Sequence, residues 1–155
     1  MNINHQLPLP DVLKEQYPLT DELRSVKSLR DSEIRKIFTG ESDKFVVVGP
    51  CSADNEDTVC EYANRLKKVN DQVSDKLMII PRVYTNKPRT TGDGYKGMLH
   101  QPEPDKAPDL LAGIIAIRKM HIRVLAETGL STADEMLYGS IRRIPYACCR
   151  RNALS

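Results

Sequence analysis

The sequence predicts an α/β fold built from parallel strand and helix units. Short continuous apolar runs alternate along the chain with longer segments of helical periodicity, and glycine or proline residues separate them. Parallel strands need such crossover helices, and their ligands bind beyond the carboxyl ends of the strands. We therefore expect the chemistry-bearing residues just after each strand.

The composition of the 155 residues is that of a soluble globular protein, with 40% apolar and 28% charged residues. A formal net charge of +2 is too small to indicate nucleic acid or a membrane surface, so we expect neither as a partner. The N-terminus has no basic segment followed by an apolar stretch, which favours a cytoplasmic location. Irregularly spaced cysteines predict reduced thiols rather than a disulfide framework.

The first expected elements are an arm with one short helix over residues 1–20 and a helix over residues 29–40 that stops at Gly40. The apolar residues at near-helical spacing in the second helix are Leu29, Ile34, Ile37 and Phe38. The run "KFVVVGP", residues 44–50, is apolar without interruption and closed by Gly-Pro, which predicts a buried strand.

A second strand and helix follow the first. Residues 53–73 predict a helix capped by Asp54, which would cover the sheet. Its apolar face consists of Val59, Tyr62, Ala63, Leu66 and Val69. The run "KLMIIPRVY", residues 76–84, predicts the second buried strand.

A long connection rich in glycine and proline, from Thr85 to Lys106, comes next, and such a length is typical of functional or disordered segments. Residues 107–120 predict a helix with Pro108 near its start. Its apolar side consists of Leu111, Ile114, Ile115 and Ile117. We expect residues 122–129, "IRVLAETG", to form a third strand.

Candidate functional groups follow each expected strand. They are Gly49, Pro50, Cys51 and Ser52 after the first strand, Arg82, Tyr84, Lys87 and Arg89 at or after the second, and Glu127 at the end of the third. Arginine offers a planar fork of donors and lysine a point charge, and the hydroxyls of Thr90 and Thr91 could complete an anion nest. The loop therefore suits a phosphorylated, anionic small molecule; the alternative is an ordinary solvated loop.

Familiar motifs do not explain this region. "VVVGPCSADN" lacks the Gly-Lys-Ser/Thr ending of an NTPase loop, and "TGDGYKG" does not fit GxGxxG. Cys51 could be a packing residue, a nucleophile or a soft metal ligand. None of the three histidines, His5, His100 and His121, stands at a metal-type spacing from Cys51, and His121 is expected at the end of a helix.

Three segments carry a family resemblance. "VVVGPCSADN", "PRVYTNKPRTTGDGYKG" and "GIIAIRKMHIRVLAETGLSTADEMLY" resemble the N-terminal half of class I 3-deoxy-D-arabino-heptulosonate 7-phosphate (DAHP) synthases, from about Leu9 to Tyr138. The resemblance implies a (β/α)₈ barrel, of which this chain has room for roughly three of the eight strands. It divides the chain into an N-terminal extension over residues 1–40, a partial barrel over 41–138 and an unrelated tail over 139–155.

The same resemblance implies an activity and a set of site residues. DAHP synthases are metal-dependent transferases of the shikimate pathway, which condense phosphoenolpyruvate with erythrose 4-phosphate and release phosphate. Cys51 resembles the family's cysteine ligand to a divalent metal of the Mn, Fe, Co or Zn type. Among the substrate contacts, Arg82 resembles a phosphoenolpyruvate ligand, Lys87 lies between the substrates, Pro88, Arg89 and Thr90 receive erythrose 4-phosphate, and Lys96 and Glu127 match positions near the phosphoenolpyruvate pocket.

The resemblance stops after Tyr138, before the strands that supply the other metal ligands of the family. A codon set for Ala147 to Leu154, shifted by one base, reads P-V-A-V-G-T-R, which resembles the family's next strand. Our hypothesis is that the tail is an out-of-frame product of a synthase gene. The alternative function is then a truncated, inactive fragment that at most forms homo-oligomers through its N-terminal extension.

Overall fold

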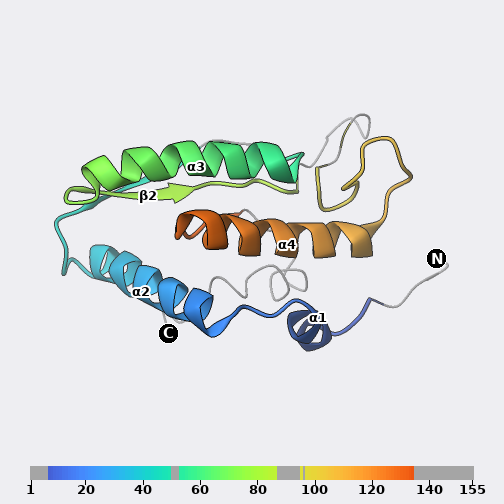
Figure 1. Ribbon diagram of the computed structural model, residues 1–155, viewed down its shortest axis with the longest axis horizontal. Coiled ribbons are helices and arrows are strands. Elements are labelled where there is room, and N and C mark those ends of the chain that lie inside the picture. The colour runs from blue at the N-terminus through green and yellow to red at the C-terminus, as the bar shows by residue number, and fades with distance from the viewer. Residues whose placement is uncertain (1–6, 50–52, 87–94, 96, 135–155) are drawn as a thin grey trace.

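The structure is a computed structural model that describes residues 7–49, 53–86, 95 and 97–134. Within these residues the elements follow in the order α1 Pro10–Gln16, α2 Asp21–Phe38, β1 Phe45–Gly49, α3 Glu56–Val73, β2 Leu77–Pro81 and α4 Leu110–Thr128. The mixture of helices and strands confirms the α/β prediction (Figure 1). None of the described helices is long and apolar enough to cross a membrane.

The two strands form a parallel pair, as their sequences predict. Phe45 pairs with Leu77 at one end of the register, and Gly49 pairs with Pro81 at the other. The strands point in the same direction, so their carboxyl ends lie next to each other. This places the segments that begin after Gly49 and after Pro81 at one edge of the molecule.

Helix α3 connects the two strands and packs against β2 and α4 (Figure 1). Asn55, rather than the expected Asp54, caps the helix, because its extended backbone lets its side chain accept a hydrogen bond of 3.0 Å from the Thr58 N–H. The predicted apolar face is only partly covered. Val59 and Ala63 are buried, whereas 47% of Val69 is exposed.

Helix α4 runs without a break through the residues expected to form a third strand, so that prediction is wrong. The helical apolar repeat of Ile114 and Ile117 continues to Val124 and Leu125, which are also buried. The first residue that breaks the helix is Gly129, which ends it in the left-handed conformation with φ 68°. Short apolar runs cannot be assigned to a strand by periodicity alone, and here no glycine or proline lies between Gly113 and Gly129 to end the helix before residues 122–129.

The N-terminal arm contains the expected short helix, α1, and the longer helix α2. The second helix begins at Asp21 rather than near residue 29, because the Thr20 side chain accepts a hydrogen bond from the Leu23 N–H and caps it there. The predicted apolar face is wrong at two positions, since Leu29 and Phe38 are 69% and 76% exposed.

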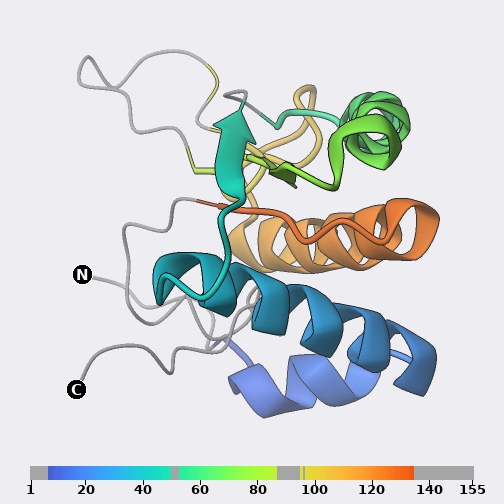
Figure 2. The same ribbon diagram turned by 90° about the vertical axis from the view of Figure 1, so that its left-hand side faces the viewer.

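A different side of α2 contacts the rest of the molecule. Leu23 and Val26 pack against Ile122 and Leu125 of α4, together with Leu19 from the preceding turn. Burying such side chains typically stabilises a fold by about 1.5–3 kcal/mol each. The N-terminal arm is therefore packed on α4 (Figure 2).

Gly113 allows α4 to approach the chain at Met98 and Leu99. A Cβ atom at Gly113 would lie 1.9 Å from the Leu99 carbonyl oxygen, a distance that no real contact allows. Met98 and Leu99 belong to the main core cluster, with Ile114 and Ile117 of the same helix. The glycine is thus required by close packing of the helix on backbone.

Arg30 links α2 to the sheet. Its Nη2 atom donates a hydrogen bond of 2.8 Å to the Ile79 carbonyl of β2. The Lys76 carbonyl and the Arg82 N–H bond to β1. Since the backbone groups of successive residues point alternately to the two edges of a strand, the Ile79 carbonyl points to the other edge of β2. The guanidinium therefore occupies a carbonyl on the edge of β2 that faces away from β1.

Candidate functional site

The segments that follow β1 and β2 are held together by backbone hydrogen bonds. The Arg82 N–H donates to the Gly49 carbonyl at 3.0 Å, which extends the parallel pairing past the end of β2. The Ala53 N–H donates to the Tyr84 carbonyl, also at 3.0 Å. The chain therefore leaves the two strands along a shared path, and this is the place where ligands bind in parallel α/β folds.

A third segment joins β2 at the same level. Arg82 and Ala133 form a parallel bridge, in which the Val83 N–H donates to the Ala133 carbonyl at 2.7 Å and the Ala133 N–H donates to the Pro81 carbonyl at 2.8 Å. The strand expected at residues 122–129 is thus absent, and the position beside β2 is taken by the chain just after α4. Three chain segments converge at the end of β2.

Arg82 presents a cation at this junction. Its backbone is fixed on both sides by the bonds to Gly49 and Ala133, and its guanidinium lies over the Tyr84 ring, 4.8 Å from the ring centroid. Stacking on an aromatic ring orients the planar guanidinium. Such a group suits recognition of a carboxylate or a phosphate.

Thr85 is bonded through each of its polar groups and is fully buried. Its N–H donates to Asp134 Oδ1 at 3.1 Å, and its hydroxyl donates to Asp134 Oδ2 at 2.6 Å. Its carbonyl accepts from the Leu99 N–H at 3.1 Å. The residue two positions before Lys87 is therefore fixed firmly in the fold.

His121 and Thr132 lie next to the Asp134 carboxylate. The Asp134 side chain is 1% exposed, and His121 Nε2 lies 3.7 Å from Asp134 Oδ2. His121 Nδ1 shares a hydrogen bond of 2.6 Å with Thr132 Oγ1. We call Asp134, Thr85, His121 and Thr132 the Asp134 network. His121 lies buried inside α4, so its expected position at the end of a helix is wrong.

Asp134 and Thr85 are not among the site residues that the sequence predicts. A single aspartate gives no signal of its own, even within the segment that carries the family resemblance, and only the folded chain brings it to the strand end. Asn86 was missed for the same reason. It is 2% exposed, and its Nδ2 has no hydrogen-bond partner in the described part of the chain.

Most of the predicted site residues lie outside the described residues. These are Pro50, Cys51, Ser52, Lys87, Pro88, Arg89, Thr90, Thr91 and Lys96. Their roles stay predictions, while the described residues on either side of them converge as expected. Among the described residues, no group of three or more histidine, cysteine or carboxylate side chains could hold a metal ion.

Glu127 does not close a strand, because it lies near the end of α4. It accepts a hydrogen bond of 2.7 Å from Arg123 Nε and one of 2.8 Å from the Asn64 amide. These bonds, from Arg123 first and from Asn64 second, lower the pKa of Glu127. Arg123 also contacts two carboxylates at the start of α3, so we define the Arg123 cluster as Arg123, Glu56, Asp57 and Glu127.

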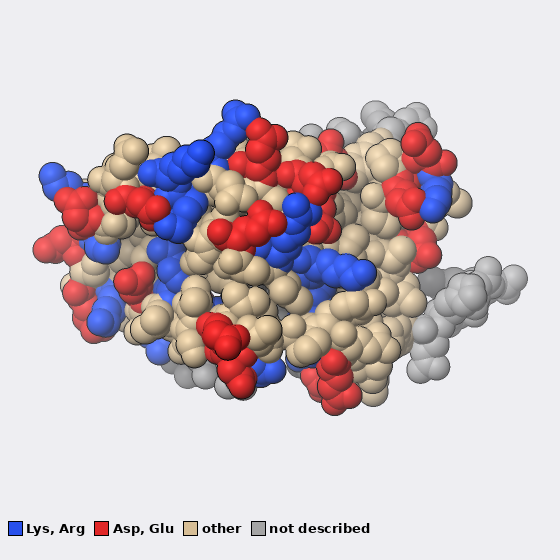
Figure 3. Space-filling model, viewed as in Figure 1, with Lys and Arg blue, Asp and Glu red and all other residues tan. Residues whose placement is uncertain are grey.

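The face of the molecule that carries α3 and α4 has mixed charge (Figure 1 and Figure 3). Figure 3 shows acidic and basic side chains interspersed over this face, without a broad patch of one sign. Such a surface gives no electrostatic footprint for nucleic acid on this side of the molecule. The expectation that anions bind only locally stays a prediction.

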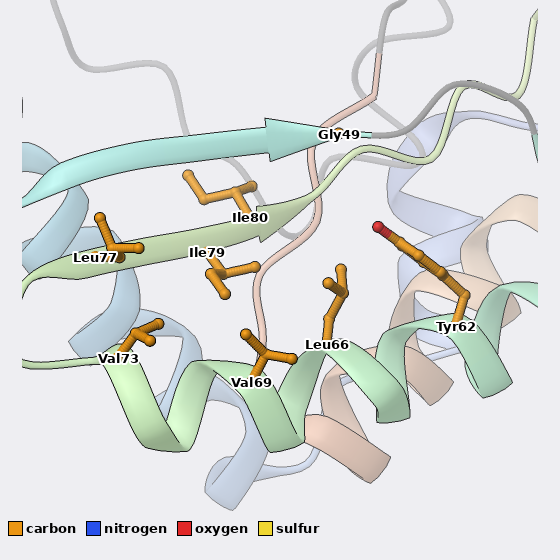
Figure 4. Close-up of a pocket in the computed structure, with 8 residues that line it drawn as sticks. All are labelled: Gly49, Tyr62, Leu66, Val69, Val73, Leu77, Ile79 and Ile80. Atoms are coloured by element: carbon orange, nitrogen blue, oxygen red, sulfur yellow. The ribbon is translucent and has the colours of Figure 1, made fainter.

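A hollow of about 440 Å³ lies between α3 and the sheet, away from the Asp134 network. Side chains from α3, among them Leu66 and Val69, point toward Leu77 and Ile79 of β2 (Figure 4). Its lining is almost entirely apolar and includes no charged group. A phosphorylated ligand would lose its hydration there without gaining partners, so the strand ends are the better candidate site.

Comparison with known proteins decides the family. The model of the DAHP synthetase I family matches residues 16–138. The chain belongs to this family. The matched region includes the ends of β1 and β2 and the predicted loop that follows β2.

Named relatives agree with this assignment. The tyrosine-sensitive phospho-2-dehydro-3-deoxyheptonate aldolase of Escherichia coli K12 is 39% identical over 134 residues, which cover 84% of this chain and 36% of that protein. The phenylalanine-inhibited enzyme of Saccharomyces cerevisiae is 35% identical over 130 residues, covering 83% of this chain and 34% of that protein. The chain thus spans little more than a third of the length of these relatives.

A solved structure has the same fold over this region. The phospho-2-dehydro-3-deoxyheptonate aldolase of Francisella tularensis SCHU S4 superimposes with a TM-score of 0.81 at 31% sequence identity. The superposition covers 95% of this chain and 43% of that chain. The arrangement of strands and helices described above is therefore also found in a known aldolase of this family.

Proposed function

We propose that the chain carries the phosphorylated-substrate site of a DAHP synthase, which condenses phosphoenolpyruvate with erythrose 4-phosphate and releases phosphate. The observation that carries the proposal is the position of Arg82 in this chain, which belongs to the family. The Arg82 backbone is fixed where the strand ends converge, and Arg82 precedes "KPRT" in sequence. Two anionic substrates need cations at one place, and ligands of parallel α/β folds bind at the strand ends, where Arg82 lies.

The proposed roles follow the family resemblance. Arg82 binds phosphoenolpyruvate, Lys87 lies between the two substrates, and Pro88, Arg89 and Thr90 receive erythrose 4-phosphate. Holding both reactants in one orientation lowers the entropic part of the barrier. Lys96 and Glu127 are assigned to the phosphoenolpyruvate pocket on the resemblance alone; the contacts of Glu127 with Arg123 and Asn64 give that role no support.

We also propose that β1, α3, β2 and α4 form the first part of a (β/α)₈ barrel. The parallel register of β1 and β2 and the crossover through α3 support this proposal. A barrel gathers its site at the carboxyl ends of its strands, where Arg82 and Asp134 lie.

A divalent metal of the Mn, Fe, Co or Zn type is part of the proposal through Cys51. Such an ion, when bound, would polarise the sugar aldehyde. The described residues do not provide a ligand set, and one cysteine is not sufficient for a catalytic metal site. We therefore derive no step through the metal.

A second candidate function is a non-catalytic subunit that forms homo-oligomers through the N-terminal arm. The chain spans 36% of the tyrosine-sensitive relative, and α1 and the residue before it expose apolar side chains, with Leu9 at 72% and Val12 at 40%. Exposed apolar groups on one element favour association.

Two measurements on the purified chain separate the candidates. Calorimetric titration with each substrate tests binding, and phosphate release with both substrates and Mn²⁺ tests turnover. We expect Arg82→Lys to weaken phosphoenolpyruvate binding about tenfold, because lysine lacks the planar fork. Arg65→Lys, an exposed arginine on α3, is the matched control. A chain that binds neither substrate contradicts the proposed function, and binding without turnover favours the subunit.

A further inference from the structure

A buried carboxylate fixes the end of β2 at a point where neither the sequence nor the comparisons assign a role. Asp134 accepts two hydrogen bonds from Thr85, one from its N–H and one from its hydroxyl. A carboxylate with 1% exposure is costly to bury, so its hydrogen bonds must repay the loss of hydration. Thr85 is thus held more firmly than strand pairing alone would require.

The bonds of Thr85 determine how the chain continues. Its carbonyl accepts from the Leu99 N–H, and the preceding Tyr84 carbonyl accepts from the Ala53 N–H. Successive backbone groups are therefore fixed from three different segments. Asn86 follows directly and is itself 2% exposed.

Asn86 carries an unused donor. Its Nδ2 is buried and has no hydrogen-bond partner within the residues that the structure describes. A buried amide donor without an acceptor is costly, and a ligand oxygen would recover that cost on binding. A donor of this kind between Arg82 and Lys87 in the sequence suits the oxygen-rich substrates of the proposed function.

We propose that Asp134, acting through Thr85, is a positioning residue that presents the Asn86 amide as a hydrogen-bond donor to the sugar phosphate. The inference rests on the proposed function for the identity of the ligand. Asn86 is the binding residue, and Asp134 contributes only by fixing the backbone that carries it. His121 and Thr132 support the carboxylate from behind.

The test compares variants of the full chain by calorimetric titration with erythrose 4-phosphate. We expect Asp134→Ala and Asn86→Ala each to weaken binding about tenfold, the loss expected for one buried hydrogen bond. The double variant should be little weaker than either single variant, because both changes remove the same donor. Asp134→Asn should restore most of the affinity, since its amide can still bond to the N–H and hydroxyl of Thr85.

Amide hydrogen exchange gives a readout that does not need the ligand. We expect Asp134→Ala, and more mildly Thr85→Val, to speed exchange at Thr85 and Asn86 about tenfold or more. The matched control is Thr128→Val, which removes a buried hydroxyl that donates to the Val124 carbonyl and accepts from the Leu130 N–H, without touching Asp134 or Thr85. This control should lower stability without altering exchange at Thr85 or the affinity for erythrose 4-phosphate.

The outcomes distinguish this inference from the proposed function. If the wild-type chain binds erythrose 4-phosphate and the Asp134 and Asn86 variants bind it equally well, the inference is wrong and the proposed function stands. If exchange at Thr85 in Asp134→Ala matches that in Thr128→Val, the positioning role is wrong whatever the ligand. A wild-type chain that binds no erythrose 4-phosphate overturns the ligand role of Asn86 together with the proposed substrate.

Discussion

The Asp134 network and the Arg123 cluster use similar chemical groups in opposite surroundings. Asp134 is 1% exposed at the strand end, whereas the Asp57 side chain in the Arg123 cluster is 82% exposed on the helix surface. A buried carboxylate leaves its partners unsatisfied when it is removed, while an exposed ion pair gives way to water at little cost. Burial, rather than the number of charges, therefore decides which network the fold depends on.

The largest effect should come from Gly113→Ala, which disturbs the buried region through the backbone. An added Cβ would meet the Leu99 carbonyl at 1.9 Å, and the N–H of Leu99 supports Thr85. We expect the free energy of unfolding in urea to fall by about 3 kcal/mol.

The control for this prediction is Ala126→Gly at an exposed position of the same helix, which should cost about 1 kcal/mol. With free space at Gly113, alanine would instead stabilise the helix by roughly 0.5–1 kcal/mol. A stable Gly113→Ala variant would therefore contradict the close approach of α4 to Leu99.

The direct comparison is Asp134→Ala against Asp57→Ala. We expect the first to lower the free energy of unfolding by about 2 kcal/mol, because the N–H and hydroxyl of Thr85 lose their acceptor. The second should have a much smaller effect, which shrinks further at high salt. Urea unfolding at low and high ionic strength measures both, and equal losses would show that burial does not separate the two networks.

Cys60 tests the effect of burial next to the Arg123 cluster, because its thiol is buried while the cluster is exposed. Burial raises its pKa from 9.0 to about 11, and the nearby charges of Arg123 and Glu127 change this less. In the unfolded chain the thiol ionises near its ordinary pKa, so folding stability should be lost as the pH rises from about 9 to 11. The loss should be on the order of 2 kcal/mol.

The measurement is the difference in unfolding free energy between the wild type and Cys60→Ala across this pH range. Mass-spectrometric mapping of thiol labelling near pH 8 gives an independent check, with Cys60 expected to react only on unfolding. A difference that does not change with pH would show that desolvation of Cys60 is unimportant.

The smallest effect should come from Glu127→Gln. The hydrogen bonds from Arg123 and Asn64 lower the pKa of Glu127 from its ordinary value of 4.5. Its contribution is therefore present above that value and is lost as the pH falls through the lowered pKa. Melting temperatures of variant and wild type should differ slightly near pH 7 and converge in acid. A large difference near pH 7 would give the exposed cluster a structural importance that its exposure argues against.

Local patterns were sufficient for the strands and for most helices. "KFVVVGP" and "KLMIIPRVY" became β1 and β2 because uninterrupted apolar runs between turn residues have few alternatives. The strand predicted over residues 122–129 was wrong, because an apolar run that continues a helix without a glycine or proline between them can remain helical. The exposure of Phe38 could not be predicted, since it depends on which side of α2 meets α4.

The site could be predicted only where the order of the elements along the chain determines which residues lie together. The position of Arg82 beside Gly49 follows from parallel pairing of adjacent strands, so sequence reasoning placed it correctly. Asp134 and Thr85 are 49 residues apart and lie in no shared motif, so their contact depends on tertiary packing. Glu127 was assigned to a strand end only because the preceding helix was cut short.

Arg30 affects which backbone groups of β2 are available to pair with a further segment. Its guanidinium bonds to the Ile79 carbonyl on the outer edge of β2, and Ala133 pairs with the next residues along that edge, Pro81 and Val83. A slip of one residue would turn every side chain of the incoming segment to the opposite face. A helix of the N-terminal arm thereby takes up the acceptor that a shift toward Ile79 would need, next to the bridge at Ala133 that aligns Asp134 with Thr85.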